Sequence, residues 1–229
     1  MRVPRLVVAG TNSGVGKTSL TLSLVCALRR RGLRVQTFKV GPDYLDPTYL
    51  QIASGRPCYN LDLWMTGRDY VRGLLARAAA GGPTAPPADI CIVEGVMGLF
   101  DGARSTSSEG STADVASLIQ APVVLVVNAH GTARSLCAVI QGFREFEQPR
   151  GPLVQGILLN RCGSESHKAL LADALGSAGL SDALLGAFAR DGLPDLPSRH
   201  LGLVTADEEI LREEHLEALA DACERSVDV

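Results

Sequence analysis

The sequence of 229 residues lacks long apolar runs and any marked excess of charge of one sign. No stretch approaches the roughly 20 apolar residues of a membrane span. The apolar run in "MRVPRLVVAG" is too short for a signal peptide. The 22 basic and 25 acidic residues are interspersed and leave a net charge of -3, unlike the basic footprint of nucleic-acid-binding proteins. We therefore expect a soluble protein that binds neither membranes nor nucleic acid and meets anionic ligands with local cations.

Paired cysteines are also missing. The six cysteines, at 26, 58, 91, 137, 162 and 223, lie far apart, and none forms a CxxC pair or has a histidine at ligand spacing. Four of them fall within apolar or helical stretches, where a free thiol behaves as a small hydrophobe. This spacing predicts neither a zinc site nor disulfides. It is typical of the reducing cytoplasm.

What the sequence does contain is an alternation of β-branched runs with segments of helical periodicity. Strands are predicted at 5–10, 34–40, 88–95, 121–129 and 154–162. Helices are predicted at 17–32, 67–82, 111–120, 131–146 and 164–179, with an acidic amphipathic helix near the end, within 207–226. The alternation predicts one α/β domain over residues 1–229, built on a doubly wound, mostly parallel sheet.

The stretch "VVAGTNSGVGKTSLTLSL" predicts a phosphate-binding loop between a strand and a helix. The backbone N–H groups of such a loop and of the helix N-terminus form a cradle for anions. Lys17 is expected to reach the β- and γ-phosphates, and the Thr18 hydroxyl to ligate Mg²⁺. The strict pattern requires glycine at position 11, where this chain has Thr11; its glycine, Gly10, comes one residue early. The expected nucleotide-binding residues of the loop are Asn12, Ser13, Gly14, Val15, Gly16, Lys17, Thr18 and Ser19.

The sequence favours ATP over GTP as the bound nucleotide, because no NKxD motif of the guanine-binding type is present. Asn160 and Arg161, which follow the last predicted strand, are candidates to contact the purine edge.

The second Mg²⁺ ligand, after the Thr18 hydroxyl, is expected to be a carboxylate at a strand end, where α/β sheets place their ligands. Glu94 follows the apolar run "DICIV", and Asp101 comes seven residues later. A capping or turn role remains the alternative for both, and it is stronger for Asp101, because Gly102 follows it.

The stretch "FKVGPDYLDPTYL", residues 38–50, places Lys39, Asp43 and Asp46 within eight residues and adds two prolines. This concentration of fixed charge predicts a loop that holds a ligand. The alternative is a rigid connection whose aspartates cap the next helix, since Asp46-Pro47 looks like an N-cap followed by proline at the first helical position.

Together these motifs resemble a known family. The phosphate loop is similar to that of dethiobiotin synthetase, and six further blocks, in order, resemble cobyrinic acid or hydrogenobyrinic acid a,c-diamide synthase from about residue 5 to about residue 210. The blocks are "FKVGPDYLDPTYL", "NLDLWM", "VEGVMGLFDG", "STADVASLIQAPVVLVVNA", "GILLNRCGSESH" and "LPSRHLGL".

The resemblance implies a P-loop NTPase of the dethiobiotin synthetase-like type that uses ATP and Mg²⁺. It implies a carbon–nitrogen ligase of cobalamin biosynthesis that amidates the a- and c-acetate carboxylates of the corrinoid through acyl phosphates. The family takes its ammonia from a C-terminal glutaminase domain of the class I amidotransferase type, for which this chain has no counterpart. A glutaminase partner and a homodimer are therefore expected.

The resemblance also implies roles for residues of the 38–50 loop. Asp46 would share Mg²⁺ with Thr18 and Glu94. Asp43 would orient the substrate or steer ammonium, and Lys39 would pair with the substrate carboxylate or the transferred phosphoryl group. Tyr44 and Leu45 would pack on the macrocycle.

Weaker candidates lie outside that loop. Asn60 and Asp62 are expected to contact substrate, with an Asx turn as an equal alternative. Trp64 is expected to lie in the core or on a lid, and contact with the macrocycle is the alternative. Residues 105–110 are expected to form either a lid over the substrate or a solvated loop. Arg199 and His200 are candidates near the nucleotide or substrate. The histidines at 130, 167 and 215 are expected to face solvent.

Other functions remain open at this point. Dethiobiotin synthetase, nickel sirohydrochlorin a,c-diamide synthase and adenosylcobyric acid synthase share parts of the pattern. A partitioning ATPase belongs to a different class, and it would carry a lysine at the position of Asn12.

Overall fold

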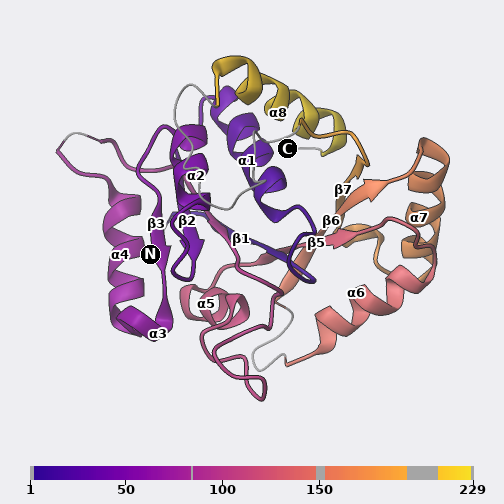
Figure 1. Cartoon of the computed structure of the whole chain (residues 1–229), viewed down its shortest axis with the longest axis horizontal. Coiled ribbons are helices and arrows are strands. Elements are labelled where there is room, and N and C mark those ends of the chain that lie inside the picture. Colours follow the sequence, from indigo (N-terminus) through magenta and orange to yellow (C-terminus); the bar gives the residue numbers. More distant parts are fainter. Residues whose placement is uncertain (1–2, 84, 148–152, 195–210, 228–229) are drawn as a thin grey trace.

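The structure is a computed structural model that describes residues 3–83, 85–147, 153–194 and 211–227. Its centre is a parallel sheet of seven strands in the order β3-β2-β4-β1-β5-β6-β7 (Figure 1). The strands are β1 (Arg5–Gly10), β2 (Val35–Val40), β3 (Tyr59–Leu61), β4 (Ile90–Glu94), β5 (Val123–Asn128), β6 (Val154–Cys162) and β7 (Leu184–Ala189). The predicted doubly wound α/β fold is confirmed.

Two layers of helices cover the sheet. One face packs against α1 (Lys17–Arg30), α2 (Asp46–Ser54) and α8 (Glu213–Ser226). The other packs against α4 (Arg68–Ala80), α5 (Thr112–Ile119), α6 (Ser135–Glu145) and α7 (Glu165–Ser177). Short turns of helix, α3 (Leu63–Thr66) and η1 (Ser181–Ala183), complete the described elements. No helix among the described residues is long and apolar enough to cross a membrane.

All five predicted strands form, and so do the helices predicted at 17–32, 67–82, 111–120, 131–146 and 164–179, with ends a few residues inside the predicted ones. The acidic helix near the end is α8, although its predicted first residues lie outside the described part of the chain. The two edge strands, β3 and β7, were missed, and α2 was foreseen only as an alternative.

The topology brings functional segments to one edge of the sheet. β1 lies between β4 and β5, with Val8 paired to Glu94 and Gly10 paired to Val126. The connection after β1 returns through α1 on one face, whereas the connection after β4 returns through α5 on the other. Ligands of open α/β sheets bind outside the carboxyl ends of the strands at such a reversal. The site is therefore expected beyond Gly10, Val40 and Glu94.

Candidate nucleotide and metal site

The phosphate loop joins β1 to α1 and depends on closely packed glycines. A Cβ at Gly10 would lie 2.6 Å from Val15 Cγ2, so the early glycine is required by the packing of the loop on itself. Gly16 has φ 98°, in the left-handed region, and a Cβ there would lie 2.2 Å from Asn160 Nδ2. The packing of the loop thus accounts for the glycines at positions 10 and 16, and the loop leads directly into the N-terminus of α1.

Lys17 lies within this loop and is 8% exposed. Its Nζ donates hydrogen bonds to the carbonyl oxygens of Asn12, at 3.0 Å, and Met97, at 2.6 Å. Burial lowers the pKa of Lys17, and the charge of Lys39 adds to the lowering, while nearby carboxylates oppose it. The ammonium is thus held between the phosphate loop and the segment that follows β4.

Thr18, Lys39, Asp46 and Glu94 form a buried cluster directly beneath the loop. Lys39 Nζ lies 2.9 Å from Asp46 Oδ2 and 3.0 Å from Glu94 Oε1, and it donates to the carbonyl oxygen of Gly95 at 2.9 Å. Thr18 Oγ1 donates to Glu94 Oε1 at 2.6 Å and lies 3.4 Å from Asp46 Oδ2. Segments from three strands therefore converge on one point: Thr18 follows β1, Asp46 follows β2, and Glu94 ends β4.

The charges in the cluster are strongly coupled. Burial raises the pKa of Glu94, which is fully buried, and the neighbouring Lys39 ammonium opposes that shift. Burial alone would lower the pKa of Lys39, but Glu94 and Asp46 together outweigh it and raise that pKa. We take Lys39 as charged, because two carboxylate oxygens and a carbonyl surround its ammonium.

The residues of this cluster fit a divalent cation. Glu94 Oε2 is buried and has no hydrogen-bond partner among the residues that the structure describes. Thr18, Asp46 and Glu94 provide only oxygen donors, which Mg²⁺ prefers. No group of three His, Cys, Asp or Glu side chains in the described ranges forms a cage for a metal. The cluster itself offers two carboxylates and a hydroxyl, and Mg²⁺ usually combines one or two carboxylates with phosphates and water.

Asp43 and Asp46 have different tasks at the start of α2. Asp43 Oδ1 accepts from the backbone N–H groups of Leu45, at 2.9 Å, and Asp46, at 3.1 Å. The helix begins at Asp46 with Leu45 as its N-cap residue, so the interpretation of Asp46 as the N-cap is wrong by one residue. The capping hydrogen bonds come from Asp43, which leaves the Asp46 carboxylate directed at Lys39 and Thr18. The other oxygen of Asp43, Oδ2, lies 3.9 Å from Lys39 Nζ.

Other candidate side chains hold the loops together. Asn60 Nδ2 donates to the carbonyl oxygens of Gly41, at 2.8 Å, and Asp43, at 2.7 Å. Asp62 Oδ1 accepts from the N–H groups of Trp64 and Met65 and caps α3. These contacts agree with the alternative of turn and capping roles.

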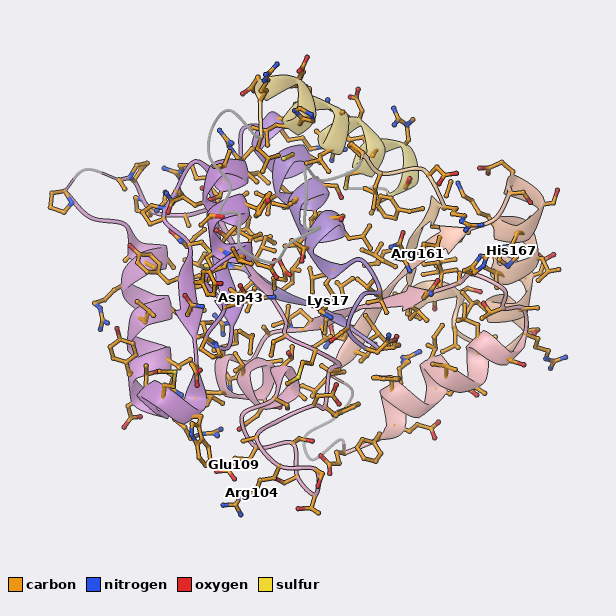
Figure 2. The ribbon with its side chains drawn as sticks, viewed as in Figure 1. Lys17, Asp43, Arg104, Glu109, Arg161 and His167 are labelled. Atoms are coloured by element: carbon orange, nitrogen blue, oxygen red, sulfur yellow. The ribbon has the colours of Figure 1, made fainter. Side chains whose placement is uncertain are left out.

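The contact of Asp101 also agrees with the predicted turn role, because its Oδ2 accepts a hydrogen bond from the N–H of Gly98 at 2.7 Å. It borders a hollow of about 420 Å³ formed by residues 100–102, residues 104–108, Phe146 and Glu147. A hollow of about 970 Å³ lies between α4, α5 and residues 100–109 and includes no residue of the phosphate loop. In Figure 2, Arg104 and Glu109 lie on a loop that projects away from Lys17.

At the end of β6, Asn160 is 5% exposed and braces the phosphate loop. Its Nδ2 donates to Val15 O at 2.8 Å, and its Oδ1 accepts from the N–H of Arg161 at 2.9 Å. Arg161 is exposed, with φ 59°, and Figure 2 shows it on the β6 side of Lys17. Both polar atoms of the Asn160 amide are thus engaged by the protein.

Two sequence expectations are corrected here. His167 does not simply face solvent: its Nδ1 accepts from the N–H of Gly163 at 3.0 Å, and its Nε2 lies 2.7 Å from Thr132 O. Trp64 is not in the core, because it is 65% exposed. Arg199 and His200 lie outside the described residues.

The sequence analysis missed the backbone acceptors of the two site lysines, Gly95 and Met97. Gly95 directly follows Glu94, and a Cβ there would lie 2.7 Å from Thr112 Cγ2, so a glycine after a strand-end carboxylate was the available signal.

A phosphate loop at the reversal of a parallel sheet, with a buried carboxylate ending the adjacent strand, defines a P-loop nucleotide-binding domain. A sequence model of the CobQ/CobB/MinD/ParA nucleotide binding domain matches residues 6–204, and the chain belongs to that family.

Curated relatives match the chain along its whole length. It is 58% identical over 229 residues to a cobyrinate a,c-diamide synthase of Syntrophotalea carbinolica, a match that covers 100% of this chain and 48% of that protein. It is 43% identical over 223 residues to a hydrogenobyrinate a,c-diamide synthase of Brucella ovis, a match that covers 97% of this chain and 49% of that protein. The chain thus spans about half the length of these relatives.

Among solved structures, chloroplast FtsY from Physcomitrella patens matches with a TM-score of 0.50 and 16% identity, over 96% of this chain and 65% of that one. This similarity shows the fold alone.

Proposed function

We propose that the chain is the ATP-dependent synthetase part of a cobyrinate or hydrogenobyrinate a,c-diamide synthase. The observation that carries the proposal is the buried cluster of Thr18, Lys39, Asp46 and Glu94 beneath the phosphate loop. The identity of 58% to a cobyrinate a,c-diamide synthase supports the choice of reaction. We propose a cytoplasmic enzyme that acts as a homodimer, receives ammonia from a glutaminase domain or subunit, and folds as one domain over residues 1–229.

The first chemical step turns a carboxylate into a better electrophile. A free carboxylate resists attack by ammonia, because attack would have to expel oxide. In the proposed reaction a carboxylate oxygen of the corrinoid attacks the γ-phosphorus of ATP, and the bond from that phosphorus to ADP breaks. The product is an acyl phosphate. The step requires two anions to approach, so positioning and charge neutralisation are the main tasks of the protein.

The second step forms the amide. The nitrogen of ammonia attacks the acyl carbon, the bond from that carbon to the phosphate oxygen breaks, and inorganic phosphate leaves. The nitrogen loses a proton, for which the carboxylates of Asp43 and Asp101 are the proposed acceptors. Both lie at the carboxyl edge of the sheet, Asp43 after β2 and Asp101 after β4.

The residues of the cluster divide the remaining roles. Lys17 binds the phosphates of ATP, and Lys39 neutralises the substrate carboxylate or the transferred phosphoryl group. Thr18, Asp46 and Glu94 are the residues that would hold Mg²⁺. When bound, Mg²⁺ supplies further neutralisation of the phosphate charge.

The remaining candidates are proposed to bind the two substrates. The loop residues Asn12–Ser19 and Arg161 contact ATP, and Asn160 supports the loop from below. Tyr44 and Leu45 contact the macrocycle, with Asn60 and Asp62 beside them.

The test is a mass measurement on the corrinoid product. The chain is incubated with Mg·ATP, either cobyrinic or hydrogenobyrinic acid, and either ammonium chloride or glutamine. Two successive losses of about one mass unit with ammonium, none with glutamine alone, and release of ADP are expected, because each conversion of –OH to –NH₂ lowers the mass by that amount. Lys17→Met, which removes the phosphate-binding cation, is the control and should abolish the change.

The result that overturns the proposal is equally direct. If neither corrinoid increases ATP turnover over the Lys17→Met background, the chain is not this synthetase. Turnover that depends on bicarbonate and a diamine would point to dethiobiotin synthetase, and turnover with nickel sirohydrochlorin would point to that diamide synthase.

A further inference from the structure

The side chain of His167 bridges two connections that are distant in the sequence, and the proposed reaction gives it no role. Its Nδ1 accepts from the N–H of Gly163 at 3.0 Å, so the proton of the neutral ring lies on Nε2. Nε2 therefore donates to the carbonyl oxygen of Thr132, which is 2.7 Å away. The contact with Gly163 is local to the start of α7, whereas the contact with Thr132 joins the connection after β6 to the connection after β5.

The contact between His167 and Thr132 is the outer end of a chain of hydrogen bonds that reaches the phosphate loop. The N–H and the Oγ1 of Thr132 both donate to the carbonyl oxygen of Ala129, at 3.2 and 2.8 Å. The N–H of Ala129 donates to the carbonyl oxygen of Asn160 at 2.8 Å. The Asn160 amide in turn donates to the carbonyl oxygen of Val15 at 2.8 Å. The start of α7 is thus linked, contact by contact, to the loop at the end of β1.

The turn between Asn160 and His167 contains a strained residue. Arg161 has φ 59°, in the left-handed region that residues other than glycine rarely adopt. Its N–H donates to Asn160 Oδ1, and the N–H of Gly163 donates to His167 Nδ1, so a side-chain acceptor holds each end of the turn. Such strain persists only where surrounding contacts fix it, and it is concentrated at functional sites. In Figure 2, Arg161 lies between Lys17 and His167 in the view.

The order of strands indicates which part of a nucleotide would lie near this turn. The cluster of Lys39 and its carboxylates belongs to β2 and β4 on one side of β1, whereas the chain of hydrogen bonds belongs to β5 and β6 on the other side. In the proposed reaction the γ-phosphate lies toward the cluster. The rest of the nucleotide then extends the opposite way, past Val15 and Gly16, which lie against Asn160. The nucleoside is therefore expected near the carboxyl ends of β5 and β6.

We propose that His167 is a positioning residue for the nucleoside half of ATP: by holding Thr132, it fixes the two connections beside which the base and the ribose bind. This inference rests on the proposed function, of which it uses only the binding of ATP. His167 acts through Thr132 and through the turn at Arg161, and it does not touch the phosphates. Its loss should therefore weaken a ligand that carries a nucleoside and spare a bare polyphosphate.

Two substitutions separate the two contacts of the imidazole ring. The amide N–H of a glutamine reaches the position of Nε2, so His167→Gln keeps the link to Thr132. The amide oxygen of an asparagine lies near the position of Nδ1, so His167→Asn keeps the local contact with Gly163 and loses the link. The binding of ATP and of inorganic tripolyphosphate, each with Mg²⁺, is measured by titration calorimetry. His167→Asn should weaken ATP about fivefold, the effect of one hydrogen bond, and leave tripolyphosphate within about twofold. His167→Gln should bind both as the wild type does.

Lys168 offers a matched control, because it occupies the next position on α7 and pairs with Glu165 of the same helix at 2.8 Å. Lys168→Gln should bind ATP and tripolyphosphate as the wild type does. In the ammonium-dependent assay, His167→Asn should raise the KM for ATP about fivefold and leave kcat and the KM for corrinoid within about twofold. Amide hydrogen exchange at 129–132 should quicken in His167→Asn and not in His167→Gln, and the same measurement checks that the rest of each variant stays folded.

The outcomes separate this inference from the proposed function. If His167→Asn weakens ATP and tripolyphosphate equally, or if His167→Gln loses as much affinity for ATP as His167→Asn, the histidine only stabilises the fold and the positioning role is wrong. If the wild type amidates the corrinoid and all variants keep the same KM for ATP, the positioning role is wrong and the function stands. If the variants differ in ATP binding as expected but the wild type amidates neither corrinoid, the positioning role stands and the proposed function fails.

Discussion

At the scale of single residues, the most consequential contact is that of Lys39 with two carboxylates. Lys39 is 2% exposed as a residue, and its Nζ lies within 3.0 Å of carboxylate oxygens of Asp46 and Glu94. The same two carboxylates are the proposed ligands of Mg²⁺. An ammonium and a divalent cation therefore compete for the same oxygens, and removing the ammonium should strengthen metal binding.

Lys39→Met tests this competition. The substitution leaves two buried carboxylates without their cation, and breaking a buried pair costs about 3–5 kcal/mol. Without metal, the free energy of unfolding of Lys39→Met should fall by about that amount, as measured by urea-induced unfolding. Addition of Mg²⁺ or Mn²⁺ without nucleotide should restore much of the loss, while the wild type should respond less.

The double variant Lys39→Met/Glu94→Gln is the matched control for that experiment. It removes one of the two charges that the metal would satisfy, so its response to metal should be smaller than that of Lys39→Met. An equal metal response in the wild type, Lys39→Met and the double variant would show that the cation does not bind at Asp46 and Glu94.

The residue scale also shows what the sequence could and could not predict about the site. The glycine loop, the lysine of the phosphate motif and the strand-end position of Glu94 are local patterns, and each appears in the structure where the pattern placed it. The division of labour between Asp43 and Asp46 is not local. It depends on where each carboxylate lies relative to Lys39, which the pairing of β2 with β4 places opposite Glu94: Asp46 Oδ2 is 2.9 Å from Lys39 Nζ, and Asp43 Oδ2 is 3.9 Å away.

At the scale of elements, β3 and β7, the two strands that the sequence analysis missed, are defined by contacts with other parts of the fold rather than by their own sequence pattern. β3 has only three residues, and its pairing comes from the neighbouring β2 rather than from its own composition. β7, "LLGAFA", contains Gly186, where a Cβ would lie 2.2 Å from the carbonyl oxygen of Ser226, the last residue of α8. That glycine is required by a contact across the fold, but in the sequence it weakens the pattern of a strand.

The amphipathic pattern of the acidic helix α8 was evident in the sequence, but the sequence did not show that α8 packs against α1. Arg30 at the end of α1 contacts three carboxylates of α8: Asp221 at 2.6 Å, Glu224 at 2.5 Å and Glu217 at 3.1 Å. The hydrogen bonds that Arg30 donates to Glu224, the largest cause, and to Asp221 raise the pKa of its guanidinium. One guanidinium thus connects the last described helix to the helix that begins at the phosphate loop.

Arg30→Gln should therefore loosen α8 more than the rest of the molecule. We expect faster amide hydrogen exchange in residues 213–226 and a small decrease in unfolding temperature. The effect should shrink at about 1 M salt, where charges are screened beyond about 3 Å. Arg31→Gln is the control, because the nearest contact of Arg31 to Glu224 is 4.0 Å. If both variants change exchange in α8 equally, or if salt has no influence, the three ion pairs of Arg30 do not hold the helix.

At the scale of the whole molecule, the site joins segments that are distant in the sequence. The phosphate loop, the start of α2, the end of β4 and the end of β6 all meet at the carboxyl edge of the sheet. A ligand that contacts all of them should stabilise the molecule as a unit. At a concentration one hundred times its dissociation constant, such a ligand contributes about 2.7 kcal/mol, which is about 5–10 °C in a chain of this size.

Mg·ATP should accordingly raise the unfolding temperature by about that amount, and it should slow amide exchange in four separate regions, at 11–18, 43–47, 94–97 and 160–161. ATP with a chelator is the matched control. The phosphate loop needs no metal to cradle an anion, so protection at 11–18 should persist. Protection at 43–47 and 94–97 should weaken, because Asp46 and Glu94 are proposed to act through Mg²⁺. Protection that remains confined to 11–18 even with Mg²⁺ would mean that the cluster beneath the loop does not take part in nucleotide binding, and the carboxylates would then belong to the stability of the fold alone.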